Sequence, residues 1–106
     1  MSVTEPSYQI AREAGHVRLS GEFDINARDD LRDAMVRAVQ HDGQGRVVID
    51  LDGTDFIDSE ALGALIDGLT AGRAAGVAMS IVNAHGLVHR VLDVSGVLAL
   101  FDPVEG

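Results

Sequence analysis

Short apolar runs alternate with longer segments of helical spacing in the first half of the chain. The pattern predicts two short strands, Tyr8 to Arg12 and His16 to Ser20, which turn at Ala14-Gly15. A helix should follow from a cap at Asn26 to about His41. Its apolar positions, which recur at helical spacing, are Ala27, Leu31, Ala34, Met35 and Ala38.

The second half repeats this alternation. The run "RVVIDL" (46–51) contains three β-branched residues and predicts a strand buried on both faces, with Asp50 at its end. A second helix should open at Asp58-Ser59 and stop between Gly72 and Gly76, and "VAMSIV" (77–82) predicts a further strand. The apolar stripe expected on the second helix is Leu62, Leu65, Ile66 and Leu69. A third helix is marked by Leu87, Val88, Val91 and Leu92 and closes at Ser95-Gly96, whereas "VLALF" (97–101) fits no single type.

Strands that alternate with helices in this way indicate an α/β domain. We expect one small domain over residues 1–106, with helices packed on a mostly parallel or mixed sheet. In such sheets the functional groups gather at the carboxyl ends of the strands and at the helix starts that follow them. The acidic stretch "DLDGTDFIDSEALG" (50–63) falls at that edge.

Composition narrows the classes of partner and site. The 106 residues are 46% hydrophobic and carry a net charge of −9, and the chain has no cysteine. A nucleic acid partner is not expected, because phosphate binding needs a basic footprint. The lack of cysteine excludes disulfides and thiolate zinc sites. We see no signal peptide and no membrane-spanning run, so we expect a cytoplasmic protein without a membrane partner.

The acidic stretch superficially resembles a calcium loop. Counted from Asp50, however, the sixth position is Asp55 instead of the glycine that an EF-hand requires, and the twelfth is Ala61 instead of glutamate. His85, His89 and Asp93 recur every four residues in the third helical segment, but they climb too far along a helix to meet one ion, and a solvated face is the simpler interpretation. We therefore expect no metal site.

Catalysis is equally poorly supported by the sequence. Ser59 is not framed by the Gly-x-Ser-x-Gly elbow of α/β-hydrolases, and the spacing of the carboxylates does not show two that converge. We expect no enzyme activity and no cofactor. Asp58-Ser59 has two readings instead: either side chain can cap the second helix, or the helix start can accept a phosphoryl group on Ser59.

Three segments of the chain resemble one known family. "GEFD" at Gly21, "VVIDLDGTDFIDSEALGALIDGLTAGRAAGVAMSIVN" and "VHRVLDVSGVLALF", which ends at Phe101, are similar to the STAS domain of anti-sigma factor antagonists. An Asp-Ser-Ser-Gly-Leu-Gly type motif opens the second helix in that family, and a partner kinase phosphorylates its first serine. The resemblance places Ser59 at that position. The family's second serine and glycine are replaced here by Glu60 and Ala61.

The resemblance also implies a partner surface and a switch. That surface would comprise Asp24, Asp58, Ser59, Glu60, Leu62 and Gly63. Without phosphate it would hold an anti-sigma factor serine kinase, so that the sigma factor is released; phosphorylation of Ser59 would weaken the complex, and a phosphatase would restore it. The alternative is a phosphorylation-independent STAS interaction subunit of a larger assembly, such as a lipid-transport or stress-signalling complex.

Overall fold

The computed structural model describes residues 7–42 and 45–103, and within these ranges strands and helices alternate as predicted. The strands are β1 (Tyr8–Glu13), β2 (His16–Phe23), β3 (Arg46–Ile57) and β4 (Ala78–Val82). The α-helices are α1 (Arg28–Arg37), α2 (Ser59–Ala74) and α3 (Gly86–Val94). Short 3-10 turns, η1 (Ile25–Ala27) and η3 (Leu98–Leu100), and one π-helical turn, η2 (Ala38–Asp42), complete the described elements.

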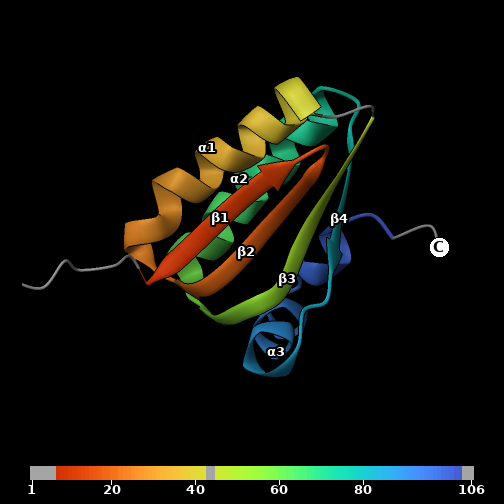
Figure 1. Cartoon of the computed structure of the whole chain (residues 1–106). Helices are drawn as coiled ribbons and strands as arrows, with labels where there is room; N and C mark the ends of the chain where they lie inside the picture. The colour runs from red at the N-terminus through yellow and green to blue at the C-terminus, as the bar shows by residue number, and fades with distance from the viewer. Residues whose placement is uncertain (1–6, 43–44, 104–106) are drawn as a thin grey trace, which may run out of the picture.

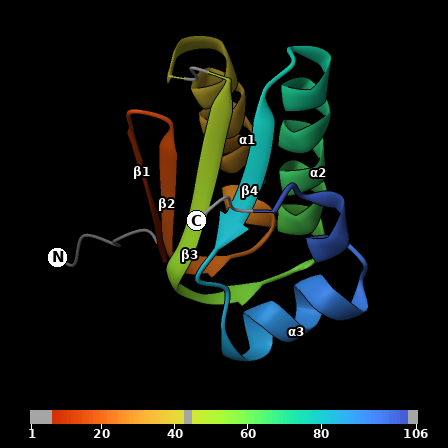
Figure 2. The ribbon, with the colours of Figure 1, turned by 90° about the vertical axis from the view of Figure 1, so that its right-hand side faces the viewer.

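The sheet is mixed and is covered by helices on one face. Its strand order is β1-β2-β3-β4; β1 pairs with β2 antiparallel, and the other two pairings are parallel. Helices α1 and α2 lie side by side on one face (Figure 1), and α3 lies beyond the carboxyl ends of β3 and β4 (Figure 2). The mixed α/β class predicted from the sequence is therefore confirmed.

Two backbone features shape the β1–β2 hairpin. Ala14 and Gly15 both have positive φ, 48° and 83°, as the two-residue turn that matches the twist of a hairpin requires. Gly21 has φ +97°, and a Cβ there would lie 2.2 Å from the carbonyl oxygen of Ser7. Only glycine fits at that position, where the end of β2 passes close to the start of β1.

The core lies between the sheet and the two long helices. Leu31 and Met35 of α1 and Leu65 and Leu69 of α2 are almost completely buried against the strands. Gly68 allows α1 and α2 to approach closely, because a Cβ at this position would lie 2.4 Å from Cε of Met35. Ile66, which we placed on the buried stripe, is instead 37% exposed, since the buried face of α2 is rotated toward Ala61, Ala64 and Gly68.

Strand β3 differs from the prediction in length and burial. It continues past Asp50 to Ile57, with register shifts against β2, and in this second half Asp52 and Asp55 are exposed whereas Thr54 is buried. Val47 and Ile49 are fully buried, but Val48 is only half-buried, because it lies on the face opposite α1 and α2. The expectation that this strand is buried on both faces is therefore wrong.

Two helix starts also correct the prediction. Asp24, not Asn26, caps the first helical segment, which opens as η1. His85 precedes α3 and is not part of it; its Nε2 lies 2.6 Å from the carbonyl oxygen of Asp52. His85, His89 and Asp93 are nevertheless all exposed, and the backbone N–H of His89 donates to the carbonyl oxygen of His85 at 3.2 Å, so the prediction of a solvated face is confirmed.

Residues 7–42 and 45–103 contain neither a candidate membrane span nor a candidate metal site. Helices in these ranges lack the combination of length and apolar character that a membrane span needs. In the same part of the chain, no three side chains of His, Asp or Glu are grouped so that they could hold a metal ion.

Candidate functional site at the start of helix α2

The ends of β2 and β3 bring the predicted site residues together. Phe23 and Ile57 are register partners at these ends, and the backbone N–H of Asp58 donates to the carbonyl oxygen of Phe23 at 3.0 Å. Asp24 and Asp58 are the next residues along each segment, so both lie where the chain leaves the carboxyl edge of the sheet. The structure thus places Asp24 beside the start of α2.

Both aspartates act as helix caps. The Asp24 carboxylate accepts a hydrogen bond from the backbone N–H of Asn26 at 2.9 Å, and the Asp58 carboxylate accepts one from Ala61 at 3.0 Å. These bonds satisfy N–H groups that have no partner inside the helical turns. The capping role that the sequence left open between Asp58 and Ser59 therefore belongs to Asp58.

Ser59 is the first residue of α2 and is exposed. Its hydroxyl makes no hydrogen bond to any residue in the described ranges. It lies at the positive end of the α2 dipole, next to N–H groups of the first turn. The hydroxyl is thus accessible and is not occupied by a structural role.

Glu60 forms an ion pair that the sequence did not reveal. Its Oε1 lies 2.7 Å from Nη1 of Arg28, and both side chains are 44% exposed. Arg28 also lies 3.4 Å from Asp29, and its hydrogen bonds to Glu60 and Asp29 raise the pKa of the guanidinium. Arg28, the first residue of α1, thus ties the start of that helix to the start of α2 and balances the charge of Glu60.

Leu62 and Gly63 follow along α2, and both are half-buried. Leu62 packs against the edge of the core, whereas a Cβ at Gly63 would meet no atom within 4 Å. Two exposed apolar side chains that we did not predict accompany them: Ile25, next to Asp24, is 56% exposed, and Phe56, two residues before Asp58, is 41% exposed. Exposed apolar residues between charged ones are typical of a protein contact surface.

Comparison with known proteins identifies the family. The family model described as "Mlab, STAS domain" matches residues 7–101. A protein of Paenibacillus polymyxa named anti-sigma F factor antagonist is 33% identical over 84 residues, which are 79% of this chain and 72% of that protein.

Two solved structures show the same fold. Superposition on the anti-sigma factor antagonist SpoIIAA in its unphosphorylated form gives a TM-score of 0.71 at 18% identity, covering 92% of this chain and 88% of that one. The phosphorylated form of the Bacillus cell fate determinant SpoIIAA gives 0.64 at 17% identity, covering 92% and 91%. On the match of the family model and the identity to the Paenibacillus protein, this chain belongs to the STAS domain family.

Proposed function

We propose that this chain is an anti-sigma factor antagonist, which binds an anti-sigma factor kinase and is switched by phosphorylation of Ser59. The observation that carries the proposal is the exposed Ser59 hydroxyl at the first position of α2, with capping left to Asp58. The name of the Paenibacillus relative and the phosphorylated form of SpoIIAA support it. The chain itself performs no chemistry in this account, since ATP and magnesium belong to the kinase.

The unphosphorylated surface would bind through apolar contacts with a charged border. Ile25, next to Asp24, and Phe56, two residues before Asp58, supply exposed apolar area. Asp24, Asp55 and Asp58 add negative charge around them, which favours a partner with basic side chains at the rim. Leu62 and Gly63 would extend this surface along α2, and binding there would free the sigma factor from the kinase.

Phosphorylation would reverse the binding. A phosphate on Ser59 adds a charge of about −1.5 to −2, and N–H groups of the first turn of α2 stabilise that charge within the free protein. The same charge in a packed contact opposes binding, and a loss of about 2.7 kcal/mol weakens a complex roughly a hundredfold. A phosphatase that removes the group would restore the binding form.

One observation favours a second candidate function. Glu60 replaces the serine that follows the phosphorylated residue in the family motif, so that a carboxylate, paired with Arg28, already occupies the position next to Ser59. A site that already contains such a charge would suit a STAS interaction subunit whose binding does not depend on phosphate. In that case the partner would be a component of a larger assembly.

Affinity capture from the native cell, followed by a kinase assay, separates the two functions. We expect the wild-type chain to retain a kinase, which then adds one phosphate to it in the presence of ATP, as measured by intact mass. Ser59→Ala should abolish the added mass, whereas the control Ser95→Ala, at the end of α3, should not. Retention of a partner that never phosphorylates Ser59 would instead support the interaction subunit.

A further inference from the structure

Helix α2 contains three glycines, and the packing of the described residues explains two of them. A Cβ at Gly68 would lie 2.4 Å from Cε of Met35, and a Cβ at Gly72 would lie 2.6 Å from Cγ of Met79. At Gly63, by contrast, a Cβ would meet no atom of the described residues within 4 Å. Glycine destabilises the interior of a helix relative to alanine. The chain thus carries at position 63 a destabilising residue that its own packing does not require.

Gly63 belongs to an exposed stripe on the outward face of α2. We define the α2 stripe as Ser59, Gly63, Ile66 and Thr70. Its members are four, three and four residues apart, so they lie on one face of the helix over about 16 Å. Ile66 is 37% exposed, and the Thr70 hydroxyl donates to the carbonyl oxygen of Ile66 at 3.0 Å. A largely apolar surface without charge therefore continues from Ser59 along the helix.

The charged residues beside the α2 stripe already have partners. On the side of α1, Oδ2 of Asp67 lies 3.9 Å from Nη1 of Arg32, and Glu60 forms the ion pair described above. On the opposite flank, Nη2 of Arg73 donates to the carbonyl oxygen of Leu100 at 2.5 Å. A partner can therefore cover the stripe without taking an unpaired charge out of water, which would oppose binding.

We propose that a helix of the partner kinase packs across the α2 stripe and approaches α2 most closely at Gly63. Two helices can come closest where one has a glycine, because no side chain separates their backbones. The inference rests on the function proposed above. A kinase that phosphorylates Ser59 must lie over the first turn of α2, and the stripe continues directly from that turn. A phosphate on Ser59 would then stand at one end of the helix contact.

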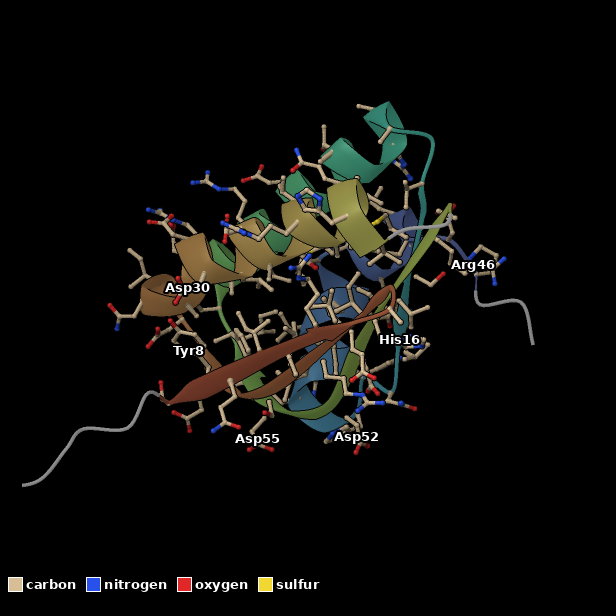
Figure 3. The ribbon with its side chains drawn as sticks, turned by 45° about the horizontal axis from the view of Figure 1, so that its top comes forward. Tyr8, His16, Asp30, Arg46, Asp52 and Asp55 are labelled. Atoms are coloured by element: carbon tan, nitrogen blue, oxygen red, sulfur yellow. The ribbon has the colours of Figure 1, made fainter. Side chains whose placement is uncertain are left out.

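Charge argues against a second copy of the chain as the occupant. The chain has a net charge of −9, and its acidic side chains are spread over the molecule. Asp30 of α1 and Asp52 and Asp55 of β3, for example, are exposed on different sides (Figure 3). Two copies would therefore repel each other. The helix that fits the stripe instead carries small or apolar residues opposite Gly63 and basic residues at its border.

Urea unfolding of Gly63→Ala tests the role of the glycine without any partner. We expect the equilibrium constant for folding to rise about threefold, because alanine is the better helix former and its methyl group has room. Gly68→Ala is the contrasting variant, and it should lower the constant because its Cβ would collide with Met35. A loss of stability in Gly63→Ala would show that this glycine is needed inside the chain and would overturn the proposal.

The affinity for the kinase, measured by isothermal titration calorimetry, tests the contact. Gly63→Ala should weaken the complex at least tenfold although it stabilises the free chain, because the added methyl group holds the two helices apart. Ile66→Ala should weaken the complex about fivefold through the loss of buried apolar area. The control is Val48→Ala, which truncates an apolar side chain on the opposite face of the sheet and should leave the affinity unchanged.

The outcomes distinguish this contact from the proposed switch. A kinase that phosphorylates Ser59 but binds Gly63→Ala and Ile66→Ala like the wild type would overturn the helix contact and leave the switch intact. A partner that is sensitive to both substitutions but never phosphorylates Ser59 would overturn the kinase as the occupant, and the proposed switch with it.

Discussion

The Arg28 guanidinium lies 2.7 Å from the Glu60 carboxylate and joins the starts of α1 and α2 next to Ser59. A carboxylate at position 60 would by itself oppose a phosphate on the neighbouring residue, because like charges repel. The arginine balances this charge within the site. Its sequence distance of 32 residues from Glu60 makes the pair a product of the fold.

Arg28→Gln should slow phosphorylation of Ser59 by the partner kinase. The substitution leaves the Glu60 carboxylate without its counter-charge, so the phosphorylated state becomes less favourable. Stability should change little, since the pair is partly exposed to solvent. The measurement is the initial rate of phosphate incorporation together with urea unfolding.

The control for this effect is the double variant Arg28→Gln/Glu60→Gln. It removes both charges and should recover most of the wild-type rate, and the set of variants then gives the coupling between the two residues. Equal rates for wild type and Arg28→Gln would show that the ion pair has no influence on the reaction.

Asp58→Ala and Ser59→Ala should differ in stability although the residues are neighbours. The Asp58 carboxylate caps α2 through the N–H of Ala61, so its removal should cost about 1 kcal/mol. Ser59→Ala should change the free energy of unfolding by less than that, because the hydroxyl makes no bond within the described residues. Urea unfolding of both variants measures the difference. A larger loss for Ser59→Ala would contradict the assignment of the cap to Asp58.

Tyr8 should titrate above the ordinary phenol pKa of 10.0, because its hydrogen bond to Asp30 raises the pKa of the hydroxyl. It is the only tyrosine in the chain, so absorbance of tyrosinate reports on it alone. Asp30→Asn should lower the midpoint toward the ordinary value. An unchanged midpoint in that variant would show that Asp30 does not control the ionisation.

The same shift gives stability a pH dependence. The folded-state pKa lies above the unfolded value of 10.0, so the folded protein holds the proton more tightly. The contribution of the hydrogen bond is fully present below pH 10 and is lost as pH rises through the folded-state pKa. Tyr8→Phe should reduce this decline in the free energy of unfolding, measured with urea on both sides of the transition.

Ile49→Asp should abolish folding, whereas Val48→Thr should be tolerated. Ile49 is fully buried in the core, and an unpaired carboxylate there costs on the order of 5 kcal/mol, similar to the stability of a whole small domain. Val48 faces the side of the sheet that α1 and α2 do not cover, so a hydroxyl there can reach solvent. Far-ultraviolet circular dichroism and urea unfolding measure both. A cooperatively folded Ile49→Asp would show that this position is not in the core.

Local patterns were enough to predict the order of strands and helices. The Ala14-Gly15 turn, the helical spacing of Leu31 and Met35 and the opening of α2 at Asp58-Ser59 each depend on residues close together in the chain. The prediction that Asp24 and the start of α2 belong to one surface came from the family resemblance and not from a local pattern. In the structure their proximity results from the pairing of Phe23 with Ile57 at the carboxyl edge.

Features that depend on how elements pack could not be predicted. The second half of β3 is rich in polar residues and looks like a loop, yet Thr54 is buried there and donates its hydroxyl hydrogen to the carbonyl oxygen of Leu19 at 2.7 Å. The contact between Arg28 and Glu60 depends on the angle at which α1 packs on α2. Residue spacing gives no information about either feature.

The dissociation constant of the kinase complex, measured by isothermal titration calorimetry with unphosphorylated and Ser59-phosphorylated protein, tests the proposed switch most directly. We expect the phosphorylated form to bind about a hundredfold more weakly, since the added charge falls inside the contact surface. Ser59→Ala should bind like the unphosphorylated wild type before and after incubation with kinase and ATP. Equal affinity of the phosphorylated and unphosphorylated proteins would contradict the switch and leave Ser59 as an ordinary residue of a binding surface.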